Sequence, residues 1–410
     1  MTEKLTLDQL REAVNTAAAF RCRRRLQPAG GAGDKVFPPT FSGAVYAEEQ
    51  RRVPGREQPV TCVLLDSVQS QANRMELALQ DAMEAKRLHM PLLVVDFSDF
   101  DPTGDLDADE QHGRLVDKVG KLTSLQLPHR LADAILRDSE LDKVPFRLSD
   151  KGRTLDEASF ANATPLFELC PTALVFGMWD STGPKGSLGP KFERAMVSEI
   201  VGIGAALDTD HMNRGVRRDP LEIRANIGVI KNPDKSWKVA EAGSKKNDKP
   251  SAINHGSVPF ARPNAGVTIE YAEQVTTLSL IGLRRYRFPL KGQDGLMNDV
   301  DQAARVALAA LGLCAATLAF EKGMDLRSRC LLWPEGVMMW ELLEKPGQEP
   351  RSFVLDGETT IDLHKAAVKA ARAHGLPCPE QALVLKPNAE LVKLVRLSQL
   401  EWTKEDKEGK

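Results

Sequence analysis

The chain has 410 residues, of which 42% are hydrophobic and 27% are charged, and its formal net charge is −2. These values are typical of a soluble globular protein that is long enough to bury a large core. They exclude a charge-driven attraction to nucleic acid over the whole surface, so only a local concentration of Lys and Arg can indicate such a partner. No run of about 18 apolar residues occurs, and we expect no membrane partner.

The N-terminal stretch MTEKLTLDQLREAV is charged and amphipathic and lacks the apolar core of a signal peptide. We therefore expect the protein to stay in the cytoplasm. The six cysteines are scattered and form no C-x-x-C pair, a pattern that favours reduced thiols over a zinc site or a disulfide framework. We expect neither a metal nor another cofactor.

The first part of the chain shows helical and strand-like patterns joined by long loops. Apolar residues recur every three or four positions from Val68 to Met83, and Asp66 with Gln69 has the spacing of a helix cap. In chain order we predict a helix at 5–20, an extended arm at 21–59, a buried strand at 60–65, the helix that Asp66 caps, a buried strand at 92–97, an acidic loop at 98–120, a short helix at 128–137 and an irregular stretch at 150–170.

The segment Ala173–Lys191, ALVFGMWDSTGPKGSLGPK, is predicted to form a strand followed by a glycine-rich loop, and a helix at 192–206 should come next. This succession brings a backbone close to phosphate, because glycine lacks Cβ and a helix N-terminus favours an anion. The pattern G-x-x-x-x-G-K-[ST] is absent, so the loop indicates phosphate contact without nucleotide hydrolysis. A surface loop with glycines that serve only its turns is the competing interpretation.

The second half of the chain opens with its longest polar stretch, residues 207–265, which glycines and prolines interrupt. A loop of this length inside a domain is functional or disordered. We then predict a strand at 266–271, a strand or helix at 275–283, a buried alanine-rich helix at 298–320, strands at 327–332 and 337–343, and a helix at 361–373. This order favours an α+β fold with a ferredoxin-like core and large insertions over a doubly wound sheet.

Positive charge is concentrated in four clusters. Residues 210–262 carry eleven Lys or Arg against six Asp or Glu, and the other clusters lie at 21–25, 284–287 and 327–329. A single cluster of this kind is typical of a solvated face, but four in a near-neutral chain favour a segregated basic groove.

Several stretches, taken together, are similar to one known family. They are CRRRLQPAGGAGDKVFPPTF (22–41), LLDSVQSQANRME (64–76), LPHRLADAILRDS (127–139), NATPLFELCPTALVFGMWDSTGPKGSLGPKFERAMVSEIVG (162–202), KPSAINHG (249–256) and DLRSRC (325–330). The chain resembles the CRISPR-associated RAMP protein of type I-G (formerly I-U) systems, the Cas-seven-type backbone subunit of a Cascade effector complex. The resemblance covers most of the chain in order.

The resemblance implies a non-catalytic subunit that polymerises along a guide crRNA and leaves the bases free to pair with a target DNA strand. Its partners would be further copies of itself in a head-to-tail filament and other Cascade subunits. The implied fold is an RRM-type palm within one domain, 1–410, that contains an extended arm at 21–59, an insertion at 98–160 and a basic thumb- or finger-like insertion at 207–265. Trp237 of the last insertion is a candidate wedge between bases.

A guide varies in sequence, so such a subunit must contact phosphate and ribose in place of base edges. The aromatic RNP signature of an ordinary RRM is indeed absent. We expect cationic and glycine-lined surfaces to converge into one continuous track. The candidate RNA-binding residues are Arg23, Arg24, Arg25, Gln27, Lys35, Gln69, Ser70, Asn73, Arg74, His129, Arg130, Lys185, Lys191, Asn254, His255, Arg284, Arg285, Arg287, Arg327 and Arg329.

Two other functions stay open at this point. Related type III backbone subunits cleave target RNA with a loop aspartate, and Asp34 beside Lys35 is the nearest equivalent here. The glycine loop at 177–191 is also compatible with an enzyme that binds a phosphate-bearing small molecule, although neither a Walker pattern nor a partnered His, Asp and Cys set accompanies it.

Overall fold

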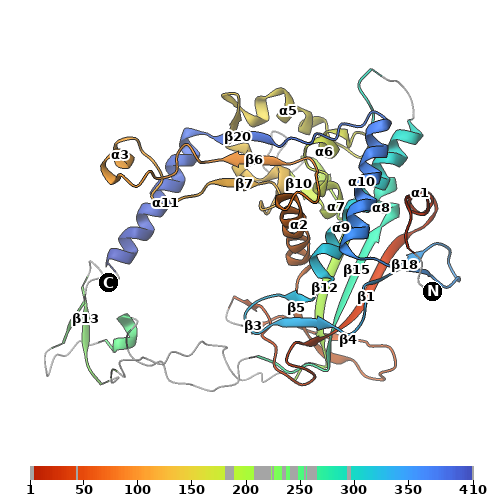
Figure 1. The fold of residues 1–410 in the computed structure, drawn as a ribbon. Coiled ribbons are helices and arrows are strands. Elements are labelled where there is room, and N and C mark those ends of the chain that lie inside the picture. Colours follow the sequence, from red (N-terminus) through yellow and green to blue (C-terminus); the bar gives the residue numbers. More distant parts are fainter. Residues whose placement is uncertain are drawn as a thin grey trace.

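The computed structural model describes residues 4–42, 45–180, 189–206, 223, 226–232, 237–240, 248–253, 255, 266–292 and 297–408. The candidates Lys185 and Asn254, and most of the 207–265 insertion, lie outside the described residues. Within that insertion the structure describes a hairpin of β13 (Val229–Lys231) and β14 (Trp237–Val239), which Figure 1 shows apart from the body of the protein.

A nine-stranded antiparallel sheet forms the core of the fold. Its centre has the strand order β18-β1-β15-β12, with α2 between β1 and β12 along the chain and α9 between β15 and β18. This is the order 4-1-3-2 of the βαββαβ unit, so the expected α+β, ferredoxin-like fold is confirmed. The central elements are β1 (Ala19–Pro28), α2 (Val68–Glu84), β12 (Met196–Ile203), β15 (Tyr271–Ser279), α9 (Asn298–Phe320) and β18 (Met339–Leu343).

Additional strands widen this sheet on both sides. β4 (Glu48–Arg51) and β5 (Val60–Asp66) extend the β12 edge, whereas β16 (Met324–Asp325), β17 (Leu331–Pro334) and β19 (Arg351–Val354) lie on the side of β1 and β18. β17 and β18 pair with opposite ends of β1, so β1 is hydrogen-bonded on both sides.

Helices cover one face of the large sheet. α9 is the central helix of this layer, and α1 (Leu7–Thr16), α2, α7 (Thr172–Phe176) and α10 (Gly357–Ala373) pack against it. α9 is long and apolar enough to cross a bilayer by length and composition alone, yet 89% of its most apolar window is buried inside the protein. The helix at 298–320 was predicted to be buried, and this is confirmed.

A second sheet of five short strands lies above α2 in Figure 1, in the order β7-β6-β20-β8-β9. Only β6 and β20 are parallel neighbours in it. The apolar side chains of Leu93 and Leu385 in this sheet belong to the same buried cluster as Val63 and Leu278 in the large sheet. The strands are β6 (Leu93–Asp96), β7 (Lys121–Thr123), β8 (Ser139–Leu141), β9 (Val144–Pro145) and β20 (Leu383–Pro387).

The remaining elements are short, apart from the last helix. Figure 1 shows α11 projecting from the second sheet and carrying the C-terminus away from the N-terminus. This last helix, α11, spans Ala389–Glu408. The short elements are β2 (Thr40–Phe41), β3 (Val45–Tyr46), α3 (Leu106–Gln111), η1 (Arg130–Ala132), α4 (Ala134–Arg137), η2 (Phe146–Leu148), α5 (Asp150–Arg153), η3 (Thr154–Glu157), α6 (Thr164–Leu169), β10 (Met178–Trp179), β11 (Lys191–Phe192), η5 (Pro250–Ile253) and α8 (Leu280–Arg284).

The predicted arm at 21–59 is wrong at its start, because residues 19–28 form the central strand β1. Along β1 the residues alternate, with Cys22, Arg24 and Leu26 buried and Arg23 and Arg25 exposed. This is the period of two of a half-covered strand. A buried arginine at one of the inward positions hid that period in the sequence.

The predicted strand, loop and helix across 173–206 are also wrong, since the order is reversed. Residues 172–176 form the short helix α7, and residues 196–203 form the strand β12. All five residues of α7 are buried, and a fully buried helical turn shows no periodicity that separates it from a buried strand. No helix N-terminus therefore follows the glycine loop, and that argument for a phosphate site is lost.

Three smaller predictions need correction. Ser67, not Asp66, caps α2, because its hydroxyl accepts a hydrogen bond from the Ser70 backbone N–H. The acidic stretch at 98–120 contains the helix α3, which Asp105 caps. Residues 326–330 form a turn before β17, in which the Leu326 N–H donates to the Cys330 carbonyl, so this stretch is not a strand.

Candidate nucleic-acid interface

The face of the large sheet opposite the helices carries charged residues. We call it the open sheet face and define it by the side chains of Arg21, Arg23 and Arg25 on β1, with Glu273 on β15 and Glu341 on β18. The strand register places these residues side by side, since Arg21 lies opposite Glu341 and Arg25 lies opposite Glu273. A hollow of about 540 Å³ is lined by these residues. Arg23 and Arg25 were candidates, and Arg21 adjoins them.

Each arginine of the open sheet face already has a carboxylate partner. Arg21 Nε lies 2.7 Å from Glu341 and Arg23 Nη2 lies 2.7 Å from Glu273. Arg25 stacks over the Tyr271 ring at 3.8 Å and lies 3.8 Å from Glu335, which also accepts a hydrogen bond of 2.8 Å from Gln27. The cations of this face are therefore largely neutralised before any ligand arrives.

A second hollow gathers residues from four separate segments, and we call it the groove. It has a volume of about 640 Å³. Its walls are the start of α2, the residues before η1, the hairpin of β10 and β11, and the first residues of β12. The residues are Val68, Gln69, Pro128, His129, Arg130, Gly177, Met178, Trp179, Lys191, Phe192, Glu193, Arg194 and Val197. The candidates Gln69, His129, Arg130 and Lys191 thus come together here, although they are far apart in sequence.

The β10–β11 hairpin supplies an aromatic ring and a cation to the groove. Trp179 and Lys191 are direct cross-strand neighbours, and the Lys191 ammonium lies 5.4 Å from the centre of the indole ring. Half of the Trp179 surface is exposed. Arg194 is exposed in the same groove and has no carboxylate partner among the described residues, whereas Glu193 is paired with Arg285 at 2.6 Å. The groove therefore has an excess of positive charge.

Trp179 and Arg194 line the groove but are not among the candidates predicted from the sequence. Both lie in or beside the glycine-rich segment, and the signal that marks them is the run W-x₁₁-K-F-E-R, which places an aromatic ring and two cations on the two arms of one hairpin. The pairing of Trp179 with Lys191 was not evident from the sequence, because residues 192–206 were predicted to form a helix. Residues on a helix have no fixed register with residues on a preceding strand.

Arg130 is fixed inside the wall of the groove. Its guanidinium donates two hydrogen bonds of 2.7 Å to the Glu76 carboxylate and one of 3.1 Å to the Gly177 carbonyl. Both Arg130 and Gly177 have positive φ angles, 52° and 82°. A Cβ on Gly177 would lie 3.0 Å from the Phe192 carbonyl oxygen, so this position favours glycine. Arg130 thus holds the chain where it enters the glycine loop and is not free for a ligand.

The first turns of α2 supply the uncharged candidates. Gln69 is exposed in the groove, and Asn73 lies one turn further along the same helix face. Neither side chain makes a hydrogen bond with another described residue. Ser70 is half-buried, and its backbone N–H donates to the Ser67 hydroxyl. The side-chain amides of Gln69 and Asn73 are therefore available to bind ribose hydroxyls or phosphate.

Arg74 and Arg327 are occupied by internal contacts on the helix-covered side. Both lie beside Asp66, a fully buried carboxylate, at 3.0 and 3.5 Å. Arg74 also donates to the Leu326 carbonyl at 2.7 Å, and Arg327 donates to the Leu65 carbonyl at 2.8 Å. They join the 326–330 turn to the start of α2, so we do not carry them forward as RNA contacts.

Three further candidates stabilise helix ends. Arg24 donates to the Phe320 carbonyl at the end of α9, at 2.9 Å. Arg284 donates to the Val14 and Ala17 carbonyls at the end of α1, at 2.8 and 2.7 Å. Arg287 lies 3.1 Å from Asp301 in the first turn of α9. Arg24 and Arg284 complement the unpaired carbonyls at helix C-termini, whereas Arg287 pairs with a carboxylate that complements the N-terminus of α9.

The remaining candidates do not line the groove, although Arg285 is paired with the groove residue Glu193. Lys35 is half-buried, and its backbone N–H donates to the Asp34 carboxylate at 2.8 Å. Arg329 stacks on Phe37 at 4.2 Å, and Arg285 stacks on Phe160 at 4.4 Å. The ring of His255 lies 5.6 Å from that of Trp237 in an edge contact.

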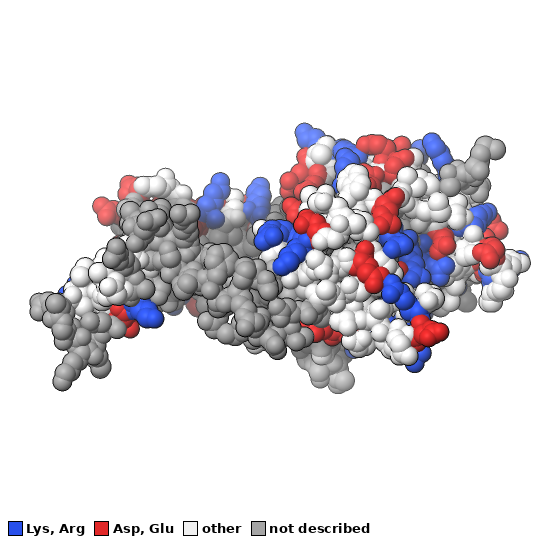
Figure 2. All heavy atoms as spheres, turned by 90° about the horizontal axis from the view of Figure 1, so that it is seen from below, with Lys and Arg blue, Asp and Glu red and all other residues white. Residues whose placement is uncertain are grey.

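Among the residues that the structure describes, the candidate cations do not lie along the expected single track. Arg23 and Arg25 are exposed on the open sheet face, Arg24 is buried and bonded to the end of α9, Arg74 and Arg327 are held at Asp66, and the groove gathers a third set. Figure 2 shows Lys and Arg intermixed with Asp and Glu over the described part of the surface seen from below. The groove and the open sheet face meet at Val197, which lines the groove and lies across Thr277 from Arg21 in the strand register.

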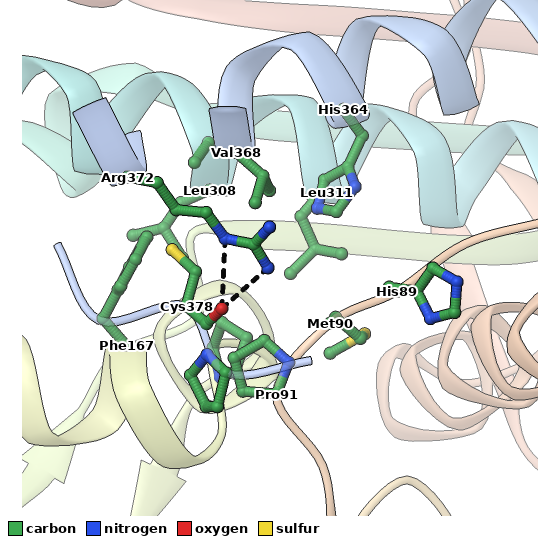
Figure 3. Close-up of a pocket in the computed structure, with 13 residues that line it drawn as sticks. His89, Met90, Pro91, Phe167, Leu308, Leu311, His364, Val368, Arg372 and Cys378 are labelled. Carbon is green, nitrogen blue, oxygen red and sulfur yellow. Dashed lines mark hydrogen bonds between the residues drawn. The ribbon is translucent and has the colours of Figure 1, made fainter. Parts of the chain in front are cut away.

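A small apolar cavity lies between α9 and α10. Figure 3 shows His364 and Leu311 above it and Met90 and Pro91 below, with Arg372 bonded to the Cys378 carbonyl at its side. Its volume of about 20 Å³ is close to that of one water molecule. The size excludes a nucleotide.

Metal-ligating side chains do not gather in the part of the chain that the structure describes, where no group of three or more His, Cys, Asp or Glu could hold an ion. All six cysteines are free thiols, and five of them are buried. Burial raises the pKa of Cys22 and of Cys314 to about 12, so these thiols are poor nucleophiles.

The comparison with protein families gives one match. Residues 20–207, somewhat less than half of the chain, are similar to the family model described as CRISPR-associated protein GSU0053. The matched span runs from β1 to the end of β12 and contains every residue that lines the groove. A search of curated proteins found no match.

Proposed function

We propose, on the premise of a CRISPR-associated protein, that the chain is a non-catalytic RNA-binding subunit of a type I-G Cascade effector. The groove is its primary contact with the guide crRNA. The observation that carries this proposal is the convergence of Gln69, His129, Trp179, Lys191 and Arg194 in one hollow inside the matched span. Further copies of the chain, other Cascade subunits and the target DNA strand are the partners that follow from this role.

The chemistry of the groove suits RNA of any sequence. Lys191 and Arg194 attract phosphate, and the amide of Gln69 can bond to a ribose hydroxyl or a phosphate oxygen. Trp179 offers a flat ring to any base, since every base has a π-face. Among the described residues that line the groove, only Glu193 is acidic, and it is already paired with Arg285. Sequence-independent binding of this kind is what a guide of variable sequence requires.

Purification of the full chain from cells tests the proposal. We expect it to elute as large assemblies with RNA of mixed sequence and a high ratio of absorbance at 260 nm to 280 nm. The double variant K191A/R194A should lose most of this RNA. The matched control is K365A/K369A, which removes two exposed lysines from α10. Elution of the wild-type chain as a monomer free of RNA contradicts the proposal.

A further inference from the structure

The three arginines of the open sheet face have three carboxylate partners once Glu335, which lies beside this face, is included. Three separate segments each place one glutamate beside β1, namely Glu273 on β15, Glu341 on β18 and Glu335 in the turn between β17 and β18. Their arginine partners Arg21 and Arg23 lie at 2.7 Å, and Arg25 lies at 3.8 Å from Glu335. Two further Arg–Glu ion pairs lie at the edge of the sheet. Arg51 lies 2.7 Å from Glu199, and Arg56 is paired with Glu270.

This arrangement is unfavourable for a polyanion, even though the face has arginines and a hollow. RNA gains affinity when a protein cation replaces the counterions of a phosphate. An arginine that a carboxylate already neutralises gives little of this gain. A phosphate bound to such an arginine would also lie close to the carboxylate of its glutamate partner, and the two negative charges would repel each other. RRM-type sheets that bind RNA present free stacking aromatics on the same face, whereas the Tyr271 ring on this face is covered by the Arg25 guanidinium at 3.8 Å.

We infer that Glu273 and Glu341 are specificity-determining residues that keep nucleic acid off the open sheet face. This inference rests on the proposed function, because it assumes that RNA is the ligand of the groove. The groove and the open sheet face adjoin at Val197, so an RNA strand in the groove has the arginines of β1 within reach. The carboxylates restrict the strand to the groove and fix its path over the subunit.

The test removes the negative charge and keeps the shape. In the double variant E273Q/E341Q each amide oxygen can still accept the hydrogen bond from its arginine. We measure binding of unstructured RNA by fluorescence anisotropy, with poly(U) and an unrelated mixed sequence of the same length as probes, at several salt concentrations. We expect binding about threefold tighter or more at low salt, and a log–log salt slope steeper by about one, because one or two further phosphates are neutralised.

The matched control is E358Q/E380Q, which breaks two Arg–Glu pairs, with Arg87 and Arg372, far from the open sheet face. It makes the same change in net charge, so it should leave affinity and slope near the wild-type values. Ultraviolet cross-linking adds a positional readout, since E273Q/E341Q should give new RNA cross-links within 19–28 and 271–279. The inference is overturned if E273Q/E341Q matches the control in affinity, slope and cross-links.

Two further variants keep the test decisive. If E273Q/E341Q does not fold, E335Q/E341Q repeats it at side chains that are 40% and 33% exposed and carry little packing. The groove variant K191A/R194A separates this inference from the proposed function. Unchanged binding of K191A/R194A refutes the groove, whereas unchanged binding of the glutamate variants refutes only the role of the carboxylates.

Discussion

Arg130 and Glu76 form a bidentate ion pair in the wall of the groove, with both N–O distances at 2.7 Å and side-chain exposures of 8% and 1%. The same guanidinium donates to the Gly177 carbonyl, where the glycine loop begins. One buried pair therefore joins α2, η1 and the loop that leads to Trp179. The Arg130–Glu76 pair therefore both stabilises the fold and holds the wall of the proposed binding site in place.

Loss of one partner of this pair should be costly. We expect E76Q or R130Q to lower the free energy of unfolding by about 3–5 kcal/mol, because each leaves a buried charge without its partner. The apolar double variant R130M/E76M should recover most of that stability, since no buried charge is left. It should still bind RNA more weakly, because Gly177 loses its donor. Urea denaturation and RNA anisotropy measure the two effects, and full RNA affinity in the double variant would count against the positioning role.

The cations of the groove and of the open sheet face should differ in their effect on RNA. Replacement of Lys191 and Arg194 by Ala should weaken RNA binding about tenfold and reduce the salt slope by about 1.4, as expected for two phosphate contacts on a single strand. Replacement of Arg23 and Arg25 should change affinity by less than about twofold, because both side chains are paired with glutamates. Equal losses in the two double variants would refute the distinction between the two surfaces.

Trp179 should contribute through its ring. We expect Trp179→Ala to weaken RNA binding by about 1–2 kcal/mol, as stacking of a base on an aromatic side chain is worth about 1–3 kcal/mol. Trp179→Phe should keep most of the affinity, and it should abolish part of the tryptophan fluorescence quenching that RNA causes in the wild type. Quenching titrations with the two variants check this, and an unchanged Kd for Trp179→Ala would exclude stacking.

His364 should make the fold sensitive to mild acid. Complete burial lowers its pKa from 6.5 to about 4, and its Nδ1 has no hydrogen-bond partner. The unfolded chain binds a proton near pH 6.5 while the folded chain does not, so stability is full above that pH and falls as the pH decreases toward 5. Urea denaturation from pH 7.5 to 5 measures this slope. His364→Leu should flatten it, and an equal slope in this variant would assign the effect to other groups.

Elements with a clear period were predictable from the sequence. The apolar run from Val60 to Leu65 gave β5, the stripe from Val68 to Met83 gave α2, and the alanine-rich stretch from 298 to 320 gave α9. The expected ferredoxin-like fold is confirmed although two of its four core strands, β1 and β12, were predicted as part of an arm and as a helix. Predictions failed where tertiary contacts override the local pattern, as in α7, whose residues are all buried, and in β1, where Arg24 points into the core.

The candidate site was only partly predictable, because charge alone does not show how an arginine is used. Arg24, Arg74, Arg130, Arg284, Arg287 and Arg327 all have internal partners. Their carbonyl and carboxylate partners are distant in sequence, so no local motif reveals them. Gln69, His129 and Lys191 were found because helix starts and glycine-rich loops are general positions for ligand contact. Their meeting in one groove depends on the sheet topology.

Mapping of RNA cross-links on the purified wild-type assembly tests the central claim most directly. Ultraviolet irradiation followed by mass spectrometry identifies the peptides that touch RNA. We predict cross-links concentrated in the segments that line the groove, 68–73, 128–130, 178–179 and 191–194, with few on β1 or β15. Cross-links concentrated on the open sheet face, with none in the groove, would contradict it.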